Sequence, residues 1–540
     1  MDLRAEIWRY SPSSGQWARV YQSPADLPNP KAPGKFVARD IGYRDMVVFT
    51  EADGTQALYI VGATAREYIP GLPPPRILRT TDGVTFAPIP QDSGTALGNL
   101  NAVTFRATAV YGNRLYVTAS PSMTGDGVVL EASTPALGNN SFRQVTSSSL
   151  HVYELDVFNG SLYIGAGDQA AGYSVWKTNA TGAPPYTLTP VVTAGAGRGS
   201  TMASVVSMHV FNNRLYVGAA AWYPTLDLTC EMIRINPDDS WQVVVGDPRL
   251  TSSGPKFPIS GFPDGFGNPY NAHIWRMEDH QGVLYAGTND DSGGLAGIPV
   301  VNLLPALFDQ YGFDLFSSAD GQHWTLITQN AFGSPLDFGC RGITSTPVGL
   351  FLGSTNYAQG TGVWLGTASG ATANLAGFAS VSSQARSGAP PVPARLRAPS
   401  RLSVEPEGTA PVVSWAPTPG ASKYQVFRAD YRLDPKAGLP KSPSSPAAST
   451  NPQAPGNRKA SSGVWVRGPF TPIATTDQPF FRDTGAADGG RYVYFVRAED
   501  QGGRSSGPSN AAAMPLVTPV ATFASTEAEI RGLVRRRKIK

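Results

Sequence analysis

The sequence has few of the residues that would commit it to metal, nucleic-acid or membrane chemistry. Only 2 of its 540 residues are cysteine, which excludes a disulfide scaffold and a cysteine-based zinc site. Charged residues make up 15%, and the net charge of +3 does not indicate a polyanionic partner. No apolar run has the length of a membrane-spanning helix, and no phosphate-binding or dinucleotide-binding glycine motif occurs. We therefore predict no cofactor, no metal, no nucleic-acid partner and no membrane span.

The beginning of the chain does not indicate where the protein is located. The first ten residues, MDLRAEIWRY, contain neither an apolar core nor a small-residue cleavage site, so they do not form a signal peptide. The abundance of glycine, serine, threonine, proline and aromatic residues is nevertheless common in exported β proteins. We leave the localisation open and favour an extracellular or cell-surface protein.

Turn-forming residues are plentiful, with 58 glycines and 47 prolines, and they punctuate an internal repeat. Six times, a short apolar strand contains an aliphatic residue followed by an aromatic one: Leu58-Tyr59, Leu115-Tyr116, Leu162-Tyr163, Leu215-Tyr216, Leu284-Tyr285 and Leu350-Phe351. Tight-turn dipeptides such as Gly112-Asn113 and Asn159-Gly160 precede these strands. Such dipeptides supply the positive φ angles that a two-residue hairpin needs. Each pair is therefore expected on the second strand of a hairpin.

Two further strands follow each hairpin, and the last of them opens with an aromatic residue such as Phe86 or Trp324. A repeat of about 50 residues with four antiparallel strands is typical of a β-propeller blade. We predict an all-β fold with a six-bladed propeller over residues 1–370. The strand around Trp17 would complete the last blade, which begins near Cys340. Seven blades are the alternative, with one blade lacking its first strands.

Two turns resemble the Asp-box hairpin of sialidase-like propellers. They are Ser318-Ala319-Asp320-Gly321-Gln322-His323-Trp324 and Thr80-Thr81-Asp82-Gly83-Val84-Thr85-Phe86. The repeat is also similar to kelch repeats, although their Gly-Gly doublets are missing. An Asp box is a folding device in which Asp and Ser or Thr bind backbone N–H groups. The resemblance therefore implies the propeller fold and leaves the reaction open.

A second domain is predicted after a linker at 371–397 that is rich in alanine, serine, glycine and proline. Residues 398–517 resemble a fibronectin type III domain, an immunoglobulin-like β-sandwich, with an early Trp415 and the segment Tyr492-Val493-Tyr494-Phe495-Val496-Arg497-Ala498. Residues 431–463 interrupt this pattern and are predicted to be a disordered insertion. The end, 518–540, is predicted to be a basic tail with a short helix.

Candidate ligand-binding residues lie on the first strand of each repeat, because first strands surround the axis of a propeller. With a one-residue slip, one position in the six strands is occupied by Arg44, Arg106, Glu154, Ser207, Arg276 and Arg341. We predict that the four arginines bind an anionic group, such as the carboxylate of an acidic sugar. The alternative is that each arginine pairs with a nearby acid, such as Asp45 or Glu278, and only ties the blades together.

Catalytic candidates are weaker. Glycoside cleavage needs two carboxyl groups at a set separation, and Glu154, Asp156, Glu278 and Asp279 lie on the same strands. The five histidines show no metal-ligand spacing. Asp290 and Asp168 lie in loops where turn formation explains them better than Ca²⁺ binding. Cys230 and Cys340 lie two repeats apart, so we expect buried thiols instead of a disulfide.

The function predicted from these observations is that of a non-enzymatic protein whose propeller binds a glycan or a protein partner. One alternative is a glycan-active enzyme, a sialidase-like hydrolase or a lyase that acts on acidic sugars. Another is a structural subunit of a larger surface assembly. The absence of catalytic motifs favours binding over catalysis.

Overall fold

The computed structural model shows a chain built from short β-strands and 3₁₀ turns. It describes residues 3–122, 127–147, 150–221, 229–251, 254–268, 270–292, 311–357, 359–368, 375–380, 396, 399–407, 410–434, 464–467, 470–487, 490–509 and 511–513. The 3₁₀ turns are η1 (Ala65–Glu67), η2 (Pro135–Leu137), η3 (Asn139–Ser141), η4 (Ala194–Gly197), η5 (Gly199–Thr201), η6 (Asp264–Gly267) and η9 (Ala331–Gly333). The prediction of an all-β fold is confirmed.

Four-stranded antiparallel units recur along the chain, and every unit is a meander in which each strand pairs with the next. Sheet 1 contains β5 (Gly42–Thr50), β6 (Gln56–Ala63), β7 (Ile77–Thr80) and β8 (Ala87–Pro88). Sheet 2 contains β9 (Thr104–Tyr111), β10 (Arg114–Ser120), β11 (Val128–Ala132) and β12 (Arg143–Gln144). Sheet 3 contains β13 (His151–Phe158), β14 (Ser161–Gly167), β15 (Ser174–Thr178) and β16 (Thr189–Val192).

The next three units follow the same plan. Sheet 4 contains β17 (Ser204–Phe211), β18 (Arg214–Ala220), β19 (Met232–Ile235) and β20 (Trp241–Val245). Sheet 5 contains β23 (Asn271–His280), β24 (Val283–Asp290), β25 (Leu315–Ser318) and β26 (Thr325–Thr328). Sheet 6 contains β27 (Gly339–Thr346), β28 (Gly349–Thr355), β29 (Val363–Ala368) and β30 (Leu375–Ser380).

The turns between first and second strands have the predicted geometry. Gly112 and Asn113 have φ angles of 53° and 56°, and Asn159 and Gly160 have 47° and 72°. Positive φ at both central residues gives the primed turn whose twist matches two paired strands. The tyrosine of the first five repeated pairs is then buried on the second strand, as for Tyr59 at 0% exposure, whereas Phe351 of the sixth pair is partly buried.

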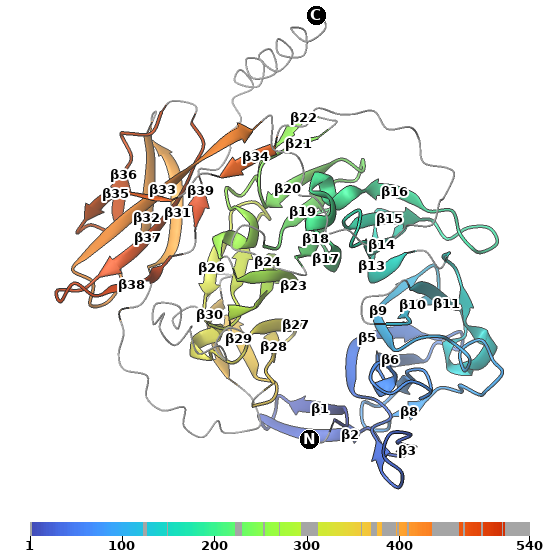
Figure 1. The fold of residues 1–540 in the computed structure, drawn as a ribbon. Coiled ribbons are helices and arrows are strands. Elements are labelled where there is room, and N and C mark those ends of the chain that lie inside the picture. Colours follow the sequence, from blue (N-terminus) through green and yellow to red (C-terminus); the bar gives the residue numbers. More distant parts are fainter. Residues whose placement is uncertain are drawn as a thin grey trace, which may run out of the picture.

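The six sheets follow one another around a ring, with the first strand of each nearest the centre (Figure 1). A backbone bridge near the beginning of the first strand joins each sheet to the next. The bridges are Ala63–Thr104, Gly127–Leu150, Gly167–Ser204, Ala220–His273 and Asn289–Gly339. These bridges bring the beginnings of all six first strands to the same end of the ring, where side chains from different sheets meet.

A separate hairpin of β1 (Glu6–Ser11) and β2 (Gln16–Gln22) lies between sheet 6 and sheet 1 (Figure 1). The Tyr10 ring packs on Phe351 of sheet 6, and Tyr21 packs on Phe86 of sheet 1. The prediction that the Trp17 strand completes the last sheet is wrong, because β30 occupies that place and β2 pairs with β1. The linker prediction is therefore also wrong for 375–380.

The inner half of this seventh position contains no strand among the described residues. Met46 and Val48 of the neighbouring strand β5 are 53% and 55% exposed. An inner strand at the seventh position would cover these two side chains. Two short pairs complete this part of the chain, β3 (Leu27–Pro28) with β4 (Phe36–Val37), and β21 (Arg249–Thr251) with β22 (Gly254–Lys256).

The C-terminal part is a second group of antiparallel strands. One sheet contains β31 (Ser400–Glu407), β32 (Ala410–Ala416) and β36 (Phe480–Arg482). The other contains β33 (Lys423–Asp434), β34 (Val464–Arg467), β35 (Thr471–Thr476), β37 (Tyr492–Glu499), β38 (Ser505–Pro508) and β39 (Ala512–Ala513), and β21 with β22 extends it through the pairing of β21 with β34. Residues 431–434 belong to β33, which corrects the start of the predicted insertion, while 435–463 and the predicted tail lie outside the described residues.

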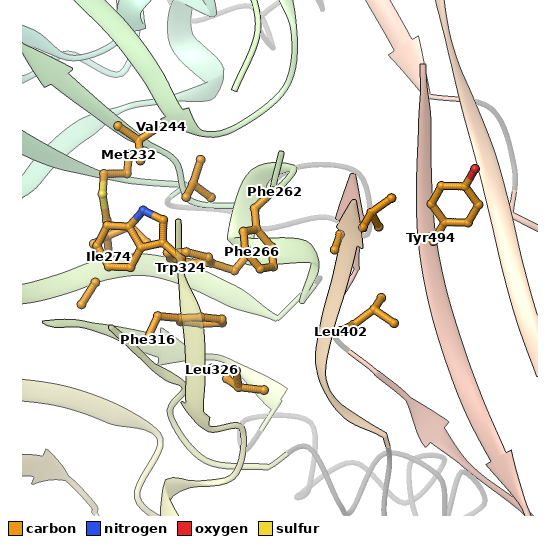
Figure 2. Packing of buried hydrophobic residues seen from close by; sticks show 14 of the residues in the cluster. Met232, Val244, Phe262, Phe266, Ile274, Phe316, Trp324, Leu326, Leu402 and Tyr494 are labelled. Atoms are coloured by element: carbon orange, nitrogen blue, oxygen red, sulfur yellow. The ribbon is translucent and has the colours of Figure 1, made fainter. Parts of the chain in front are cut away.

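One hydrophobic core connects the ring with these C-terminal strands (Figure 2). Phe266 stacks on Phe316 of sheet 5 with ring centroids 3.8 Å apart, and the same cluster contains Leu402 of β31. The backbone also crosses the boundary, because the Ala513 N–H donates to the Gly261 carbonyl at 2.8 Å. The two parts therefore share buried surface.

Candidate functional site

Each first strand carries a β-bulge close to its beginning. The register shifts occur at Arg44, at Arg106 with Ala107, and at Tyr153, Val206, Trp275 and Arg341. A bulge inserts an extra residue and changes the direction of the side chains around it. The slip in the sequence alignment has this cause, because Arg44, Arg106 and Arg341 lie in the bulge while Glu154, Ser207 and Arg276 follow it.

Three of these side chains, Arg106, Glu154 and Arg276, form a charged cluster with Asp45 that we call the central ion network. The Arg276 guanidinium lies 3.4 Å from an Asp45 oxygen and 3.8 Å from a Glu154 oxygen. Arg106 Nε lies 3.8 Å from the other Glu154 oxygen. Arg276 therefore joins sheet 5 to sheets 1 and 3, neither of which is its neighbour in the ring.

Asp45 is fixed by hydrogen bonds as well as by charge. Its Oδ2 accepts from the backbone N–H and from the hydroxyl of Thr108, both at 2.8 Å. These donors belong to sheet 2, whereas Asp45 belongs to sheet 1. The carboxylate therefore has a defined position beside Arg276.

Glu154 has the electrostatic environment of a proton donor. Burial raises the pKa of its carboxyl to about 7, and the nearby Arg276 and Arg106 offset only part of that rise. The side chain is 7% exposed, so water solvates its ionised form poorly. At neutral pH a large fraction of Glu154 therefore carries a proton.

A second acidic group surrounds His209. Its Nε2 lies 2.9 Å from an Asp279 oxygen. Burial raises the pKa of Asp156 and of Glu278. The charge of His209 counteracts this rise in both, after the Val157 backbone N–H in the case of Asp156. The structure thus places the predicted acidic candidates on inner strands, and within the described residues Glu154 is the one among them with ion pairs to Arg106 and Arg276, both at 3.8 Å.

Arg341 differs from Arg106 and Arg276. No carboxylate lies within ion-pair distance of it in the described part of the chain, and burial lowers its pKa. Its guanidinium lies over the Trp275 ring, 4.9 Å from the centroid. Trp275 in turn contacts Phe338 at 6.4 Å, and Phe338 contacts Tyr357 at 4.8 Å between ring centroids. We call Trp275, Phe338 and Tyr357 the aromatic strip.

The strip approaches the central ion network through His273. The His273 ring lies 5.5 Å from Trp275, and burial together with Arg106 lowers the pKa of His273 to about 3. At its other end Tyr357 is 83% exposed. Sequence reasoning missed this strip, although Trp275 is the residue directly before Arg276.

The four predicted arginines have different surroundings. Arg106 and Arg276 pair with acids, as the structural alternative predicted, whereas Arg341 has an aromatic contact instead. Arg44 lies in the bulge of β5. Whether any of the four binds a ligand stays a prediction.

The loop aspartates have the turn geometry that we predicted. Asp168 Oδ1 accepts from the backbone N–H groups of Ala170 and Ala171, and Asp290 Oδ1 accepts from that of Ser292. Among the residues described, no group of three or more histidine, cysteine, aspartate or glutamate side chains could hold a metal ion. Within those same ranges every helix is too short or too polar to span a membrane.

Comparisons with known proteins found similar structures but no family. No protein-family model matches the chain, and no curated protein matches it. One similar structure is the extracellular domain of a one-component system from B. thetaiotaomicron, with 12% identity, 96% of this chain and 57% of that chain covered, and a TM-score of 0.36. Another is an ancestral GH74 enzyme, with 13% identity, 77% and 50% covered, and a TM-score of 0.39.

A third similar structure is the catalytic domain of the GH62 α-L-arabinofuranosidase of Coprinopsis cinerea, with 13% identity, 49% and 88% covered, and a TM-score of 0.29. This finding contradicts the prediction of a non-enzymatic binding protein, because the similar structures include glycan-active enzymes. The alternative of a glycan-active enzyme agrees with it better. All three TM-scores lie below 0.5.

Proposed function

We propose that the protein is a glycan-active enzyme that cleaves glycosidic bonds, with Glu154 as its general acid. The observation that carries the proposal is the buried Glu154 carboxyl, whose pKa of about 7 lies near the pH at which such an acid works best. A carboxylic acid that keeps its proton at neutral pH can protonate the oxygen of a leaving sugar.

Asp45 is the second carboxyl group of the proposed site. It lies on the other side of the Arg276 guanidinium from Glu154, with contacts of 3.4 Å and 3.8 Å. Two carboxyl groups that flank one guanidinium are separated by roughly 5–9 Å, the range that glycoside hydrolases use. The hydrogen bonds from Thr108 fix the position of the Asp45 carboxyl group beside Arg276, where it would serve as the second carboxyl group of this chemistry.

The surrounding architecture supports this proposal at the level of the fold. We interpret the ring as a β-propeller with six complete blades and a seventh that consists of β1 and β2. The C-terminal strands are proposed to be a fibronectin type III-like sandwich. An extracellular or surface localisation would give such an enzyme access to polysaccharides, and a glycan is the proposed ligand.

The test is the activity of Glu154→Gln on a panel of polysaccharides, measured as released reducing ends. Loss of a general acid lowers kcat by about 10²–10⁴-fold. The wild-type rate is expected to fall as the pH rises through about 7, because Glu154 then loses its proton.

Glu131→Gln is the matched control, since Glu131 is also buried, at 1% exposure, and contacts Arg143 outside the proposed site. It is expected to retain the wild-type rate. Equal activity of wild type and Glu154→Gln on every substrate that the wild type cleaves, or no cleavage by the wild type across the panel, would refute the proposal.

A further inference from the structure

We propose that the aromatic strip and Arg341 form a binding subsite for a uronic acid unit of a glycan, with sugar rings on Trp275, Phe338 and Tyr357 and the carboxylate on Arg341. This inference deepens the proposed function and rests on it for the position of the bond that is cleaved. It does not depend on the role of Glu154, because binding can be measured without turnover.

The first argument is the exposure of the strip. Tyr357 is 83% exposed although it contacts Phe338, so a large aromatic surface faces solvent instead of the core. Phe338 and Trp275 continue this surface inward with partly buried rings. Aromatic faces bind the apolar C–H faces of sugar rings, whose hydroxyl groups point outward along the ring edge. A row of three rings accordingly offers contacts to successive sugars of a chain.

The Trp275 ring is preorganised for ligand binding. A Cβ at Gly339 would overlap the Trp275 ring, so the glycine lets the backbone of β27 approach that ring closely. The guanidinium of Arg341 covers another part of the same ring at 4.9 Å. Trp275 is therefore held from two directions, and its orientation costs little entropy when a ligand binds.

The charge of Arg341 favours an acidic ligand. Arg106 and Arg276 contact Asp45 and Glu154, whereas no acid pairs with Arg341 in the ranges that the structure describes. An arginine keeps its charge even when partly buried, and it binds carboxylates through two parallel N–H groups. A ligand carboxylate would supply the missing counter-charge. A neutral sugar would leave it unbalanced, which favours an acidic glycan.

The direction of the strip connects this subsite with the proposed acid. From Tyr357 the rings lead through Phe338 and Trp275 to His273. His273 lies close enough to Arg106 for the cation to lower its pKa, and Arg106 contacts Glu154. A glycan on the strip would therefore have one end near Glu154.

The test is isothermal titration calorimetry on the full chain carrying Glu154→Gln. The probes are oligosaccharides from polygalacturonate, alginate and hyaluronate, each beside a counterpart whose carboxyl groups have been reduced to alcohols. At least one native probe is expected to bind at least about tenfold more tightly than its reduced form, with an affinity that falls as salt increases. Arg341→Gln should abolish this difference, and Tyr357→Ala should weaken both forms about fivefold.

The controls are Arg491→Gln, which removes another arginine that lies over an aromatic ring, and Tyr68→Ala, which removes another exposed tyrosine. Both should bind as the parent does. Equal affinity for native and reduced probes, no binding of any probe, or unchanged binding by Arg341→Gln and Tyr357→Ala would overturn the inference. Carboxylate-dependent binding without Glu154-dependent cleavage would refute the proposed function alone.

Discussion

At the scale of single residues, Glu154 shows how burial can favour the neutral form of a carboxyl group even beside arginines. Its ionised form lies near two arginines, at 3.8 Å from each, yet burial dominates and the pKa rises. Desolvation of a carboxylate costs more than two charge contacts at this distance return. The same balance makes the residue useful as an acid and costly to the fold at high pH.

A first prediction concerns the pH dependence of stability. The folded pKa of Glu154, about 7, lies above its ordinary value of 4.5, so the folded state binds more protons between these values. The stability that the protonated form provides is present below pH 4.5 and is lost as the pH rises through 7. Relative to Glu154→Gln, the wild type should lose about 3 kcal/mol of unfolding free energy between pH 4.5 and pH 8.

The measurement is urea unfolding of wild type, Glu154→Gln and Glu131→Gln at several pH values. Glu131→Gln controls for the loss of a buried glutamate elsewhere in the ring. Parallel pH profiles of wild type and Glu154→Gln would show that the pKa of Glu154 is not raised.

The residues of the site could be predicted only in part from the sequence. The repeat placed Arg106, Glu154 and Arg276 on equivalent strands, and the structure joins them. The partner Asp45 and the contacts of Arg341 depend on bulges, which displace side chains by one position and leave no mark in a hydrophobic pattern. The aromatic strip combines Trp275 of sheet 5 with Phe338 and Tyr357, which lie just outside the strands of sheet 6, and no local rule connects them.

At the scale of elements, turns decide where strands begin and end. The hairpin between β25 and β26 contains Asp320, whose Oδ1 accepts from the backbone N–H groups of Gln322 and His323, both at 2.8 Å. Gly321 follows with a φ of 71°, and Trp324 is buried after the turn. This is the local chemistry that the sequence predicted, because every partner lies within four residues.

A second prediction tests this turn. Asp320→Ala leaves two backbone donors without their acceptor and should lower the unfolding free energy by about 1 kcal/mol, as the loss of a helix cap does. Asp320→Asn keeps an acceptor oxygen in place and should cost less than half as much. Urea unfolding at pH 7 measures both variants. Equal stability of the alanine variant and the wild type would contradict the role of Asp320 in the turn.

The strand β30, which the sequence analysis did not predict, depends on long-range pairing instead of local turn chemistry. The segment of β30, LAGFAS, lies among small residues that are common in linkers, and its strand state depends on pairing with β29. Pairing with a distant partner can override a weak local preference. Local signals therefore identified the hairpins, and long-range pairing decided the last strand of sheet 6.

At the scale of the whole molecule, the shared core makes the ring and the C-terminal strands one cooperative structure. Leu402 and Val404 of β31 belong to the same buried cluster as Phe262 and Phe316 of the ring (Figure 2). A large apolar interface couples the unfolding of two parts, because exposing either face costs free energy.

A third prediction follows for Leu402→Ala. Leu402 is 3% exposed, so its truncation leaves a cavity that should cost about 3 kcal/mol. Differential scanning calorimetry should show one transition for the wild type and one transition at a lower temperature for the variant. Leu336→Ala, at a residue that is 40% exposed, is the control and should leave the transition unchanged. Two separate transitions would contradict a shared core.

At the hairpin β1–β2 the ring is held together differently from its other junctions, so it behaves mechanically as an open ring. Backbone bridges join the sheets at all the other junctions. At the junction with sheet 6, in the part of the chain that the structure describes, the Tyr10 ring packs on Phe351 instead. A load that spreads the ring would therefore be taken up between β27 and β5. The 3.4 Å contact between Arg276 and Asp45 links sheet 5 to sheet 1, so one ion pair also spans this less firmly joined part of the ring.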